Sequence, residues 1–196
     1  ILTSSDGNLW GSKTSSSSNT LSAVTFGNNV FVAVGNSGTI LTSSDGSSWT
    51  SRSYDPGNFQ SALLDITFGN NIFVTVGASS SILTSSDGSS WTSRSSGIST
   101  QFNGIVFGLN SFESVGNQGT IVTSSNGLTW SSRTSSIPSD SGGVIPNLQK
   151  ITYGNSTFVV VYDKGRILIS SDGNSWERKT ITNSSVDFYG ITFRGN

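Results

Sequence analysis

The sequence predicts an all-β protein, a β-propeller built from four-stranded antiparallel blades, and two observations predict it. The first is a ten-residue motif, I-[LV]-[TI]-S-S-[DN]-G-x-x-W, that occurs five times and ends each time in a tryptophan: Trp10, Trp49, Trp91, Trp130 and Trp176. The second is the spacing of these tryptophans. Their four intervals cover 166 residues, so the repeat averages 41.5 residues, and about 40 to 50 residues make one four-stranded blade.

One complete unit shows how the four strands follow one another. Strand a is expected over Leu21–Phe26, strand b over Val30–Val34, strand c over Thr39–Ser43 and strand d over Ser48–Arg52. Glycine and asparagine stand between these segments and supply the positive φ angles that tight hairpins need. The unit is therefore expected to be an antiparallel meander.

The same order recurs along the chain, which is expected to be one domain, 1–196. Complete units are expected at 21–52, 62–94, 102–133 and 148–179, and partial units at 1–13 and 188–196. Strand b is apolar at nearly every position, as in FVAVG and FVTVG, which indicates a strand covered on both faces by neighbouring blades. Glu113 interrupts this run in the third complete unit.

The way the repeats are cut predicts how the ring closes. The chain opens on strands c and d and ends on a lone strand a, Phe188–Phe193, so that one strand b is missing. Five repeats of 41.5 residues need about 207 residues, about 11 more than the 196 present. We therefore expect five blades, the last assembled from both chain ends, with residues beyond Asn196 supplying the absent strand. An arc cut from a six- to eight-bladed ring is the alternative.

Composition excludes several classes of function. Ten basic and eleven acidic residues leave a net charge of -1, which argues against nucleic acid as a partner. No apolar segment has the length of about 20 residues that a membrane-spanning helix needs, so no membrane insertion is expected. Cysteine and histidine are absent, so we expect neither metal nor cofactor. A serine-rich, weakly charged chain favours an extracellular, cell-surface or virion-associated location.

The motif resembles the Asp-box, or bacterial neuraminidase repeat, over essentially the whole chain. In that family the box forms the hairpin between strands c and d. The resemblance implies that the carboxylate accepts hydrogen bonds from N–H groups of the turn, while tryptophan packs the hairpin onto its blade. Structural roles are therefore expected for the acidic or amide residue of each box: Asp6, Asp45, Asp87, Asn126 and Asp172. Asn126 keeps the acceptor but lacks the charge, which favours a structural role over catalysis.

Sialidases share this box, so an enzymatic role has to be considered. Their sites use three arginines, a tyrosine with a glutamate, and an acidic proton donor. Four arginines here follow the motif tryptophan at two or three residues and belong to the repeat: Arg52, Arg94, Arg133 and Arg178. Glu113 and Glu177 have no evident tyrosine partner. We therefore expect no enzymatic activity, and a sialidase-like glycoside hydrolase is the least favoured reading.

Two loops between strand d and the next strand a, 53–60 and 135–147, are longer than their counterparts. Insertions on one face of a repeat array often mark a binding surface. In the first loop Tyr54 and Phe59 are aromatic residues outside the repeat pattern that could stack on a sugar, with Asp55, Asn58 and Gln60 as hydrogen-bonding neighbours. The alternative is a surface turn held by its own aromatic residues.

A second group of candidate ligand-binding residues lies near the start of strand a, which is expected to line the central channel. These positions vary from unit to unit and carry polar groups: Asp65, Asn103, Gln149, Lys150 and Tyr189. Asp163 and Lys164 stand in a loop between strands b and c and are expected on the same face. This polar mouth could hold a small ligand or only water, and the loop pair could be a solvated turn.

The favoured function is a non-enzymatic extracellular binding module with lectin-like glycan recognition through loops on one face of the propeller, where several weak sites gain by avidity. The alternative is a structural or adhesive protein–protein module of a cell surface, phage tail or other extracellular assembly. The expected partner is accordingly a glycan or a surface protein. A larger chain or assembly is a further possible partner, since it would supply the missing strand.

Overall fold

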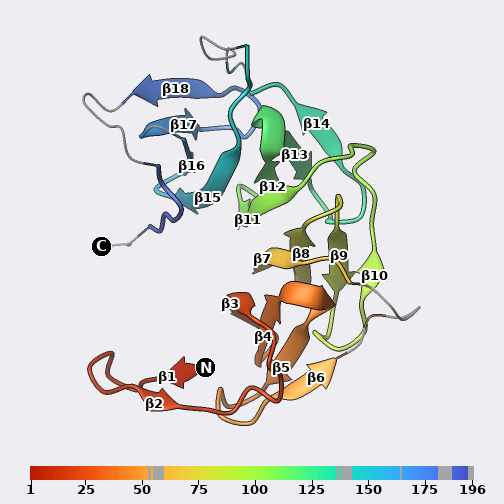
Figure 1. Ribbon diagram of the computed structural model, residues 1–196. Coiled ribbons are helices and arrows are strands. Elements are labelled where there is room, and N and C mark those ends of the chain that lie inside the picture. The colour runs from red at the N-terminus through yellow and green to blue at the C-terminus, as the bar shows by residue number, and fades with distance from the viewer. Residues whose placement is uncertain are drawn as a thin grey trace.

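The computed structural model describes residues 1–52, 54, 60–135, 137, 143–163, 165–180 and 187–193. These residues form four sheets of four antiparallel strands and a separate two-stranded hairpin. The sheets stand side by side around a central axis, and the N-terminal hairpin and residues 187–193 lie on the same side of the arrangement (Figure 1). The prediction of an all-β propeller with four-stranded antiparallel blades is confirmed.

We number the blades in chain order. The N-terminal hairpin is β1 (Leu2–Thr3) and β2 (Gly11–Ser12). Blade 1 is β3 (Leu21–Gly27), β4 (Val30–Gly35), β5 (Ile40–Ser43) and β6 (Thr50–Arg52), and blade 2 is β7 (Leu63–Gly69), β8 (Ile72–Gly77), β9 (Ile82–Ser85) and β10 (Thr92–Ser93). Blade 3 is β11 (Phe102–Gly108), β12 (Ser111–Gly116), β13 (Ile121–Ser124) and β14 (Ser131–Arg133), and blade 4 is β15 (Leu148–Gly154), β16 (Thr157–Tyr162), β17 (Arg166–Ser170) and β18 (Glu177–Thr180).

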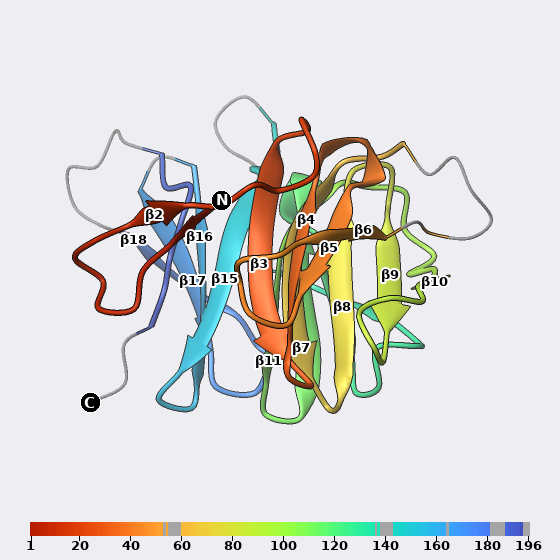
Figure 2. The same ribbon diagram turned by 90° about the horizontal axis from the view of Figure 1, so that it is seen from below.

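Within each blade the first strand lies nearest the axis and the fourth lies outermost (Figure 1). The side view separates two faces of the ring (Figure 2). We call the face with the a–b turns and the motif hairpins the hairpin face, and the opposite one the loop face. The a–b turns need positive φ at both central residues, and Asn28 and Asn29 supply φ values of 45° and 59°. The expected use of asparagine in these turns is therefore confirmed.

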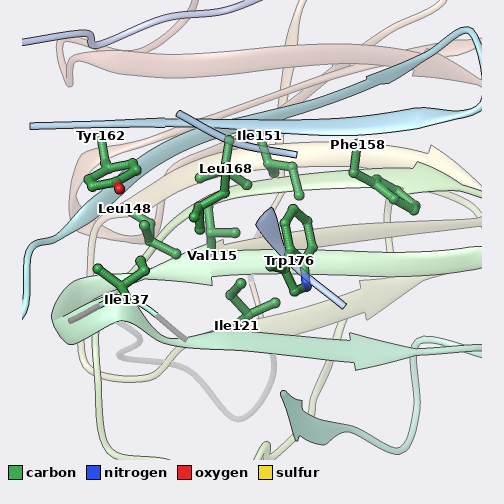
Figure 3. Packing of buried hydrophobic residues seen from close by; sticks show 10 residues of the cluster. Val115, Ile121, Ile137, Leu148, Ile151, Phe158, Tyr162, Leu168 and Trp176 are labelled. Atoms are coloured by element: carbon green, nitrogen blue, oxygen red, sulfur yellow. The ribbon is translucent and has the colours of Figure 1, made fainter. Parts of the chain in front are cut away.

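The hydrophobic core lies in the seams between neighbouring blades. Each seam holds one cluster of buried side chains from two adjacent sheets, and Figure 3 shows the cluster between blades 3 and 4, with Ile121, Leu148, Phe158 and Trp176. Strand b of blades 2 and 3 is buried because a neighbouring sheet covers each of its faces. The apolar strand b segments thus indicated the right packing.

Glycine occurs at the end of strand a because of a close packing contact, and not because the turn requires a positive φ there. Gly27 does not have a positive φ, and a Cβ there would overlap the aromatic ring of Phe68 from the next blade. The same close approach recurs between Gly69 and Phe107. These glycines therefore let an aromatic ring of one blade lie flat against the backbone of the preceding blade.

The two ends of the arc differ from the inner blades. Val24 of blade 1 is 60% exposed, whereas Ile66, in the same position of blade 2, is 5% exposed. Phe193 lies against Gly154, as strand a of a following blade would. Residues 187–193 nevertheless form no strand, so the strand expected over Phe188–Phe193 is not observed. A strand needs a hydrogen-bonded neighbour, and none of the described strands pairs with this segment.

Helical structure in the described part of the chain consists of two single 3₁₀ turns, Asn36–Gly38 and Asn117–Gly119. Neither could reach across a bilayer.

Candidate functional site

The polar residues at the start of strand a meet at the axial end of the loop face. The ammonium of Lys150, on blade 4, lies 3.1 Å from the carboxylate of Asp65, on blade 2, and also donates to the backbone of Leu64. The Asp65 carboxylate accepts further hydrogen bonds from the backbone N–H groups of Ile66 and Ile105. Burial raises the pKa of Asp65, while Lys150 acts in the opposite direction. This ion pair therefore joins blades 2 and 4 across blade 3.

Other predicted mouth residues are also bonded within the protein. The Asn103 amide donates to the carbonyl of Leu148 at 2.8 Å and to Asn117 at 2.9 Å. The Gln149 amide donates to Asp163 at 3.1 Å. The bond from Asn103 to Leu148 joins blades 3 and 4, whereas Gln149 and Asp163 are bonded to each other within blade 4.

The remaining predicted ligand residues are spread out. Tyr189 is 71% exposed and its hydroxyl donates to Asp187. Tyr54 is partly buried and packs against the hydrophobic cluster between blades 1 and 2. Gln60 is exposed. Asp55, Asn58, Phe59 and Lys164 lie outside the described residues.

The five motif hairpins have the hydrogen bonds expected of them. In blade 1 Oδ1 of Asp45 accepts from the backbone N–H groups of Ser47 and Ser48 at 2.7 and 2.8 Å, and the Trp49 indole donates to Gly46 at 3.0 Å. Backbone hydrogen bonds, that from Ser48 foremost, lower the pKa of Asp45.

The other four motif hairpins repeat this pattern. Asn126 accepts the two corresponding N–H bonds at 2.8 and 3.0 Å with its amide oxygen. The carboxylates of Asp6, Asp87 and Asp172 also hold turns. The indoles of Trp10, Trp91, Trp130 and Trp176 likewise donate to the motif glycine. These residues build the hairpins.

A different site lies on the hairpin face, in the seam between blades 3 and 4. In the two preceding seams the motif glycine of the next blade packs on valine of strand b, Gly88 on Val32 and Gly127 on Val74. In the third seam the corresponding contact of Gly173 is with Glu113. Ser111 stands where blades 1 and 2 have valine and isoleucine. The third seam therefore has a smaller side chain at Ser111 and an ionisable one at Glu113, where the two preceding seams are apolar.

The Glu113 side chain is buried, with 1% of its surface exposed. Its Oε1 accepts hydrogen bonds from the hydroxyls of Thr123 at 2.6 Å and Ser111 at 3.0 Å. Its Oε2 is also buried and has no hydrogen-bond partner among the described residues. Burial raises the pKa of Glu113 to about 7, against the effect of the two hydroxyls. A buried polar atom without a partner is costly and calls for an explanation.

Glu113 lines a cavity of about 370 Å³ on the hairpin face, a volume within the usual range for small-molecule sites. Two charged groups share the cavity, Arg133 from blade 3 and Asp172 from the motif hairpin of blade 4. Arg133 lowers the pKa of Glu113 and Asp172 raises it. Asparagine, serine and threonine side chains make up most of the remaining wall.

This cavity lies on the face opposite to the one where the sequence placed the ligand. The signal in the sequence was Glu113 itself, because it alone puts a charge into the otherwise apolar strand b segments of the four complete units. No group of three or more acidic residues that could hold a metal ion is present among the described residues.

Comparison with known proteins identifies the fold. No protein-family model matches the sequence, and no curated protein matches it. Solved structures do match. YCF48 bound to a D1 peptide superposes with a TM-score of 0.66 at 19% identity, over 89% of this chain and 57% of that one. Virginiamycin B lyase from Staphylococcus aureus, with quinupristin, gives a TM-score of 0.74 at 12% identity, over 89% and 60%. The chain is a β-propeller.

A third match is the computationally designed Ika4 protein, with a TM-score of 0.57 at 17% identity, over 79% of this chain and 92% of that one. This chain spans about three fifths of the length of the YCF48 and lyase structures. At these identities the likeness concerns the fold alone, and a peptide-bound protein and an enzyme are both among the matches. A shared fold does not determine function, which depends on the residues of the site.

Proposed function

We propose that this protein is a non-enzymatic, extracellular binding module that recognises glycans as a lectin does, and that the Glu113 cavity is its binding site. The observation that carries the proposal is the polar cavity of about 370 Å³ around a buried carboxyl group with one oxygen unpaired. The proposal keeps the predicted kind of ligand and moves the site from the loop face to the hairpin face. The motif belongs, in this proposal, to the Asp-box type.

A saccharide suits this cavity because both have many hydrogen-bonding groups. Sugar hydroxyls both donate and accept, and the residues that line the cavity offer matching groups: the Glu113 carboxyl as acceptor, the Arg133 guanidinium as donor, and the Asn110 and Asn174 amides as both. A ligand hydroxyl on Oε2 would also supply the partner that this oxygen lacks.

The charges in the cavity fit binding better than hydrolysis. Glycoside hydrolysis needs two carboxyl groups free to act on one bond. Asp172 is engaged in its own turn, where Oδ1 accepts from the N–H groups of Asn174 and Ser175 at 2.8 Å each. In blade 3 the uncharged amide of Asn126 accepts the corresponding hydrogen bond of its turn. We therefore assign the motif carboxylates to structure.

A glycan array probed with the wild-type protein and with Glu113→Val tests this proposal. Valine is the residue at this position in blades 1 and 2, so the variant restores an apolar seam and is expected to fold. We expect the wild type to bind a restricted set of glycans and the variant to lose at least tenfold in affinity for them. Equal binding by both proteins would move the site elsewhere, and no binding by a folded wild type would refute glycan recognition.

The open side of blade 1 favours a structural or adhesive module as a second candidate. Val24 and Phe26 are 60% and 52% exposed, and Trp10 of the N-terminal hairpin is 60% exposed. These are the surfaces that a neighbouring blade covers elsewhere in the molecule, so a partner polypeptide could supply the missing strands there. A concentration-dependent mass in analytical ultracentrifugation, abolished by Phe26→Ser, would support this role, and a monomer at all concentrations would count against it.

A further inference from the structure

The unpaired oxygen of Glu113 identifies the kind of group that would complete the cavity. Buried carboxylates in proteins are paired with a cation or fully hydrogen-bonded. Here the two hydroxyl donors, from Ser111 and Thr123, both serve Oε1, and Oε2 receives none. The protein therefore satisfies one oxygen of the carboxylate and leaves the other without a donor, in a side chain that lines the cavity.

The charges that face Glu113 leave the cavity negative. Arg133, from β14, is exposed at the rim, and Asp172 faces the cavity from the hairpin between β17 and β18. The groups of β12 and β13 that contact the carboxyl are neutral hydroxyls. With Glu113 ionised, two carboxylates stand against one guanidinium. A cation is thus the ligand group that offsets both the excess charge and the missing hydrogen bond.

The wall of the cavity narrows the choice of cation. Leu109 is the only apolar residue among the twelve that line it. An alkyl ammonium such as a lysine side chain would find almost no apolar surface for its methylene groups. A sugar ring surrounds an amine with hydroxyl groups, which match the serine, threonine and asparagine side chains of the wall.

From these contacts we propose that the cavity binds a saccharide with a free primary amine, whose ammonium donates to Oε2 of Glu113 while its ring hydroxyls bond to the polar wall. This inference rests on the proposed glycan-binding function and names the class of sugar. An acetylated amine is neutral and larger, so it neither offsets the charge nor offers three donors.

The experiment measures binding of D-glucosamine, N-acetyl-D-glucosamine, D-glucose and Nα-acetyl-lysine amide by isothermal calorimetry and ligand-observed NMR. At pH 7 we expect glucosamine to bind at least tenfold more tightly than the other three. Equal binding of the three sugars would overturn the amine requirement and leave the proposed function intact. Stronger binding of the lysine derivative would overturn the assignment to a saccharide. Binding of none of the four would overturn the inference about the amine, while the glycan array decides on the proposed function.

The pH dependence provides a second readout. An ammonium binds the ionised form of Glu113, whose pKa in the empty site is raised to about 7 by burial. Affinity for glucosamine should then fall roughly 15-fold from pH 7 to pH 5.5, because the ionised fraction falls by that factor while the amine stays protonated. A ligand that accepts a proton from neutral Glu113 would bind more tightly at pH 5.5, and that result would overturn the proposal.

Two variants separate the effect of the Glu113 charge on binding from effects on folding. Glu113→Gln keeps the shape of the side chain and removes the charge, and should abolish the preference for glucosamine over glucose. Glu177→Gln is the matched control, because Glu177 lies on the surface of β18 and pairs with Lys179 outside the cavity. A preference that survives in Glu113→Gln would overturn the proposal.

Discussion

Replacing Glu113 with glutamine should remove a pH dependence from the stability of this protein. The pKa of Glu113 is raised from its ordinary value of 4.5 to about 7, chiefly by burial. Between these two values the folded state holds more protons than the unfolded state, so the free energy of unfolding falls as the pH rises. At 1.36 kcal/mol per pH unit, the wild type should lose about 2–3 kcal/mol between pH 5 and pH 8 through this one group.

Urea unfolding followed by tryptophan fluorescence at pH 5, 6, 7 and 8 measures the effect. We expect the difference between wild type and Glu113→Gln to change by the amount given above over this range, while Glu177→Gln follows the wild type. The motif aspartates do not interfere. Hydrogen bonds lower their pKa values below 3.8, so the stability that they contribute is lost only in more acidic solution. If the free energy of unfolding depended on pH in the same way in the wild type and in Glu113→Gln, the pKa of Glu113 would not be raised by folding, which would refute the prediction.

Three further changes test the packing, each by urea unfolding. Gly69→Ala places a Cβ inside the aromatic ring of the next blade and should cost about 1–3 kcal/mol, whereas Gly190→Ala, where a Cβ meets no atom within 4 Å, should cost nothing measurable. Ile66→Ala should cost about 2–4 kcal/mol and Val24→Ala less than about 1 kcal/mol, because their exposed fractions are 5% and 60%; equal costs would show that another segment covers blade 1. Lys150→Met leaves a buried carboxylate without its cation and should cost about 3 kcal/mol, and an unchanged stability would mean that the ion pair is not formed.

Repetition made the fold predictable from one sequence. The motif tryptophans set the unit length, and the Gly-Asn turns placed the ends of strands a and b within one residue of their observed positions. The tail of the chain was less predictable. Residues 187–193 resemble a strand a in sequence, yet a strand also needs a partner, and sequence similarity to a strand does not supply one.

The glycines show a limit of turn-based reasoning. Asn28 and Asn29 have the positive φ values expected of a hairpin, but Gly27 is required by an aromatic ring more than 40 residues away in the sequence. A local rule cannot detect a contact of this kind. Only the recurrence of Phe-Gly at the same place in successive units hinted at it, because a turn alone does not require the aromatic residue.

The cavity around Glu113 was not predicted for a related reason, since loop length drew attention to the loop face. Insertions are visible in a sequence, whereas a cavity formed by a smaller side chain is not. Ser111 opens the seam because blades 1 and 2 fill the same place with valine and isoleucine. The predicted polar residues Asp65, Asn103, Gln149 and Lys150 are already bonded to other groups of the protein. Available polar groups, more than polar residues as such, therefore indicate where a ligand binds.

Comparison of the three seams between blades shows whether the fold requires a carboxyl group at the position of Glu113. Two seams of the same molecule solve the same packing problem with apolar side chains, so the fold itself does not require a carboxyl group here. The third seam departs from the pattern at Ser111 and at Glu113 together, and Thr123 donates its hydroxyl to the carboxyl, whereas in blade 1 the corresponding Thr42 accepts from Arg52. A local departure that lowers stability above pH 4.5, and that is made by several residues at once, is expected where a protein binds something. A cation on Oε2 would remove that cost in the bound state. Binding of a cation would therefore explain why this seam differs from the other two.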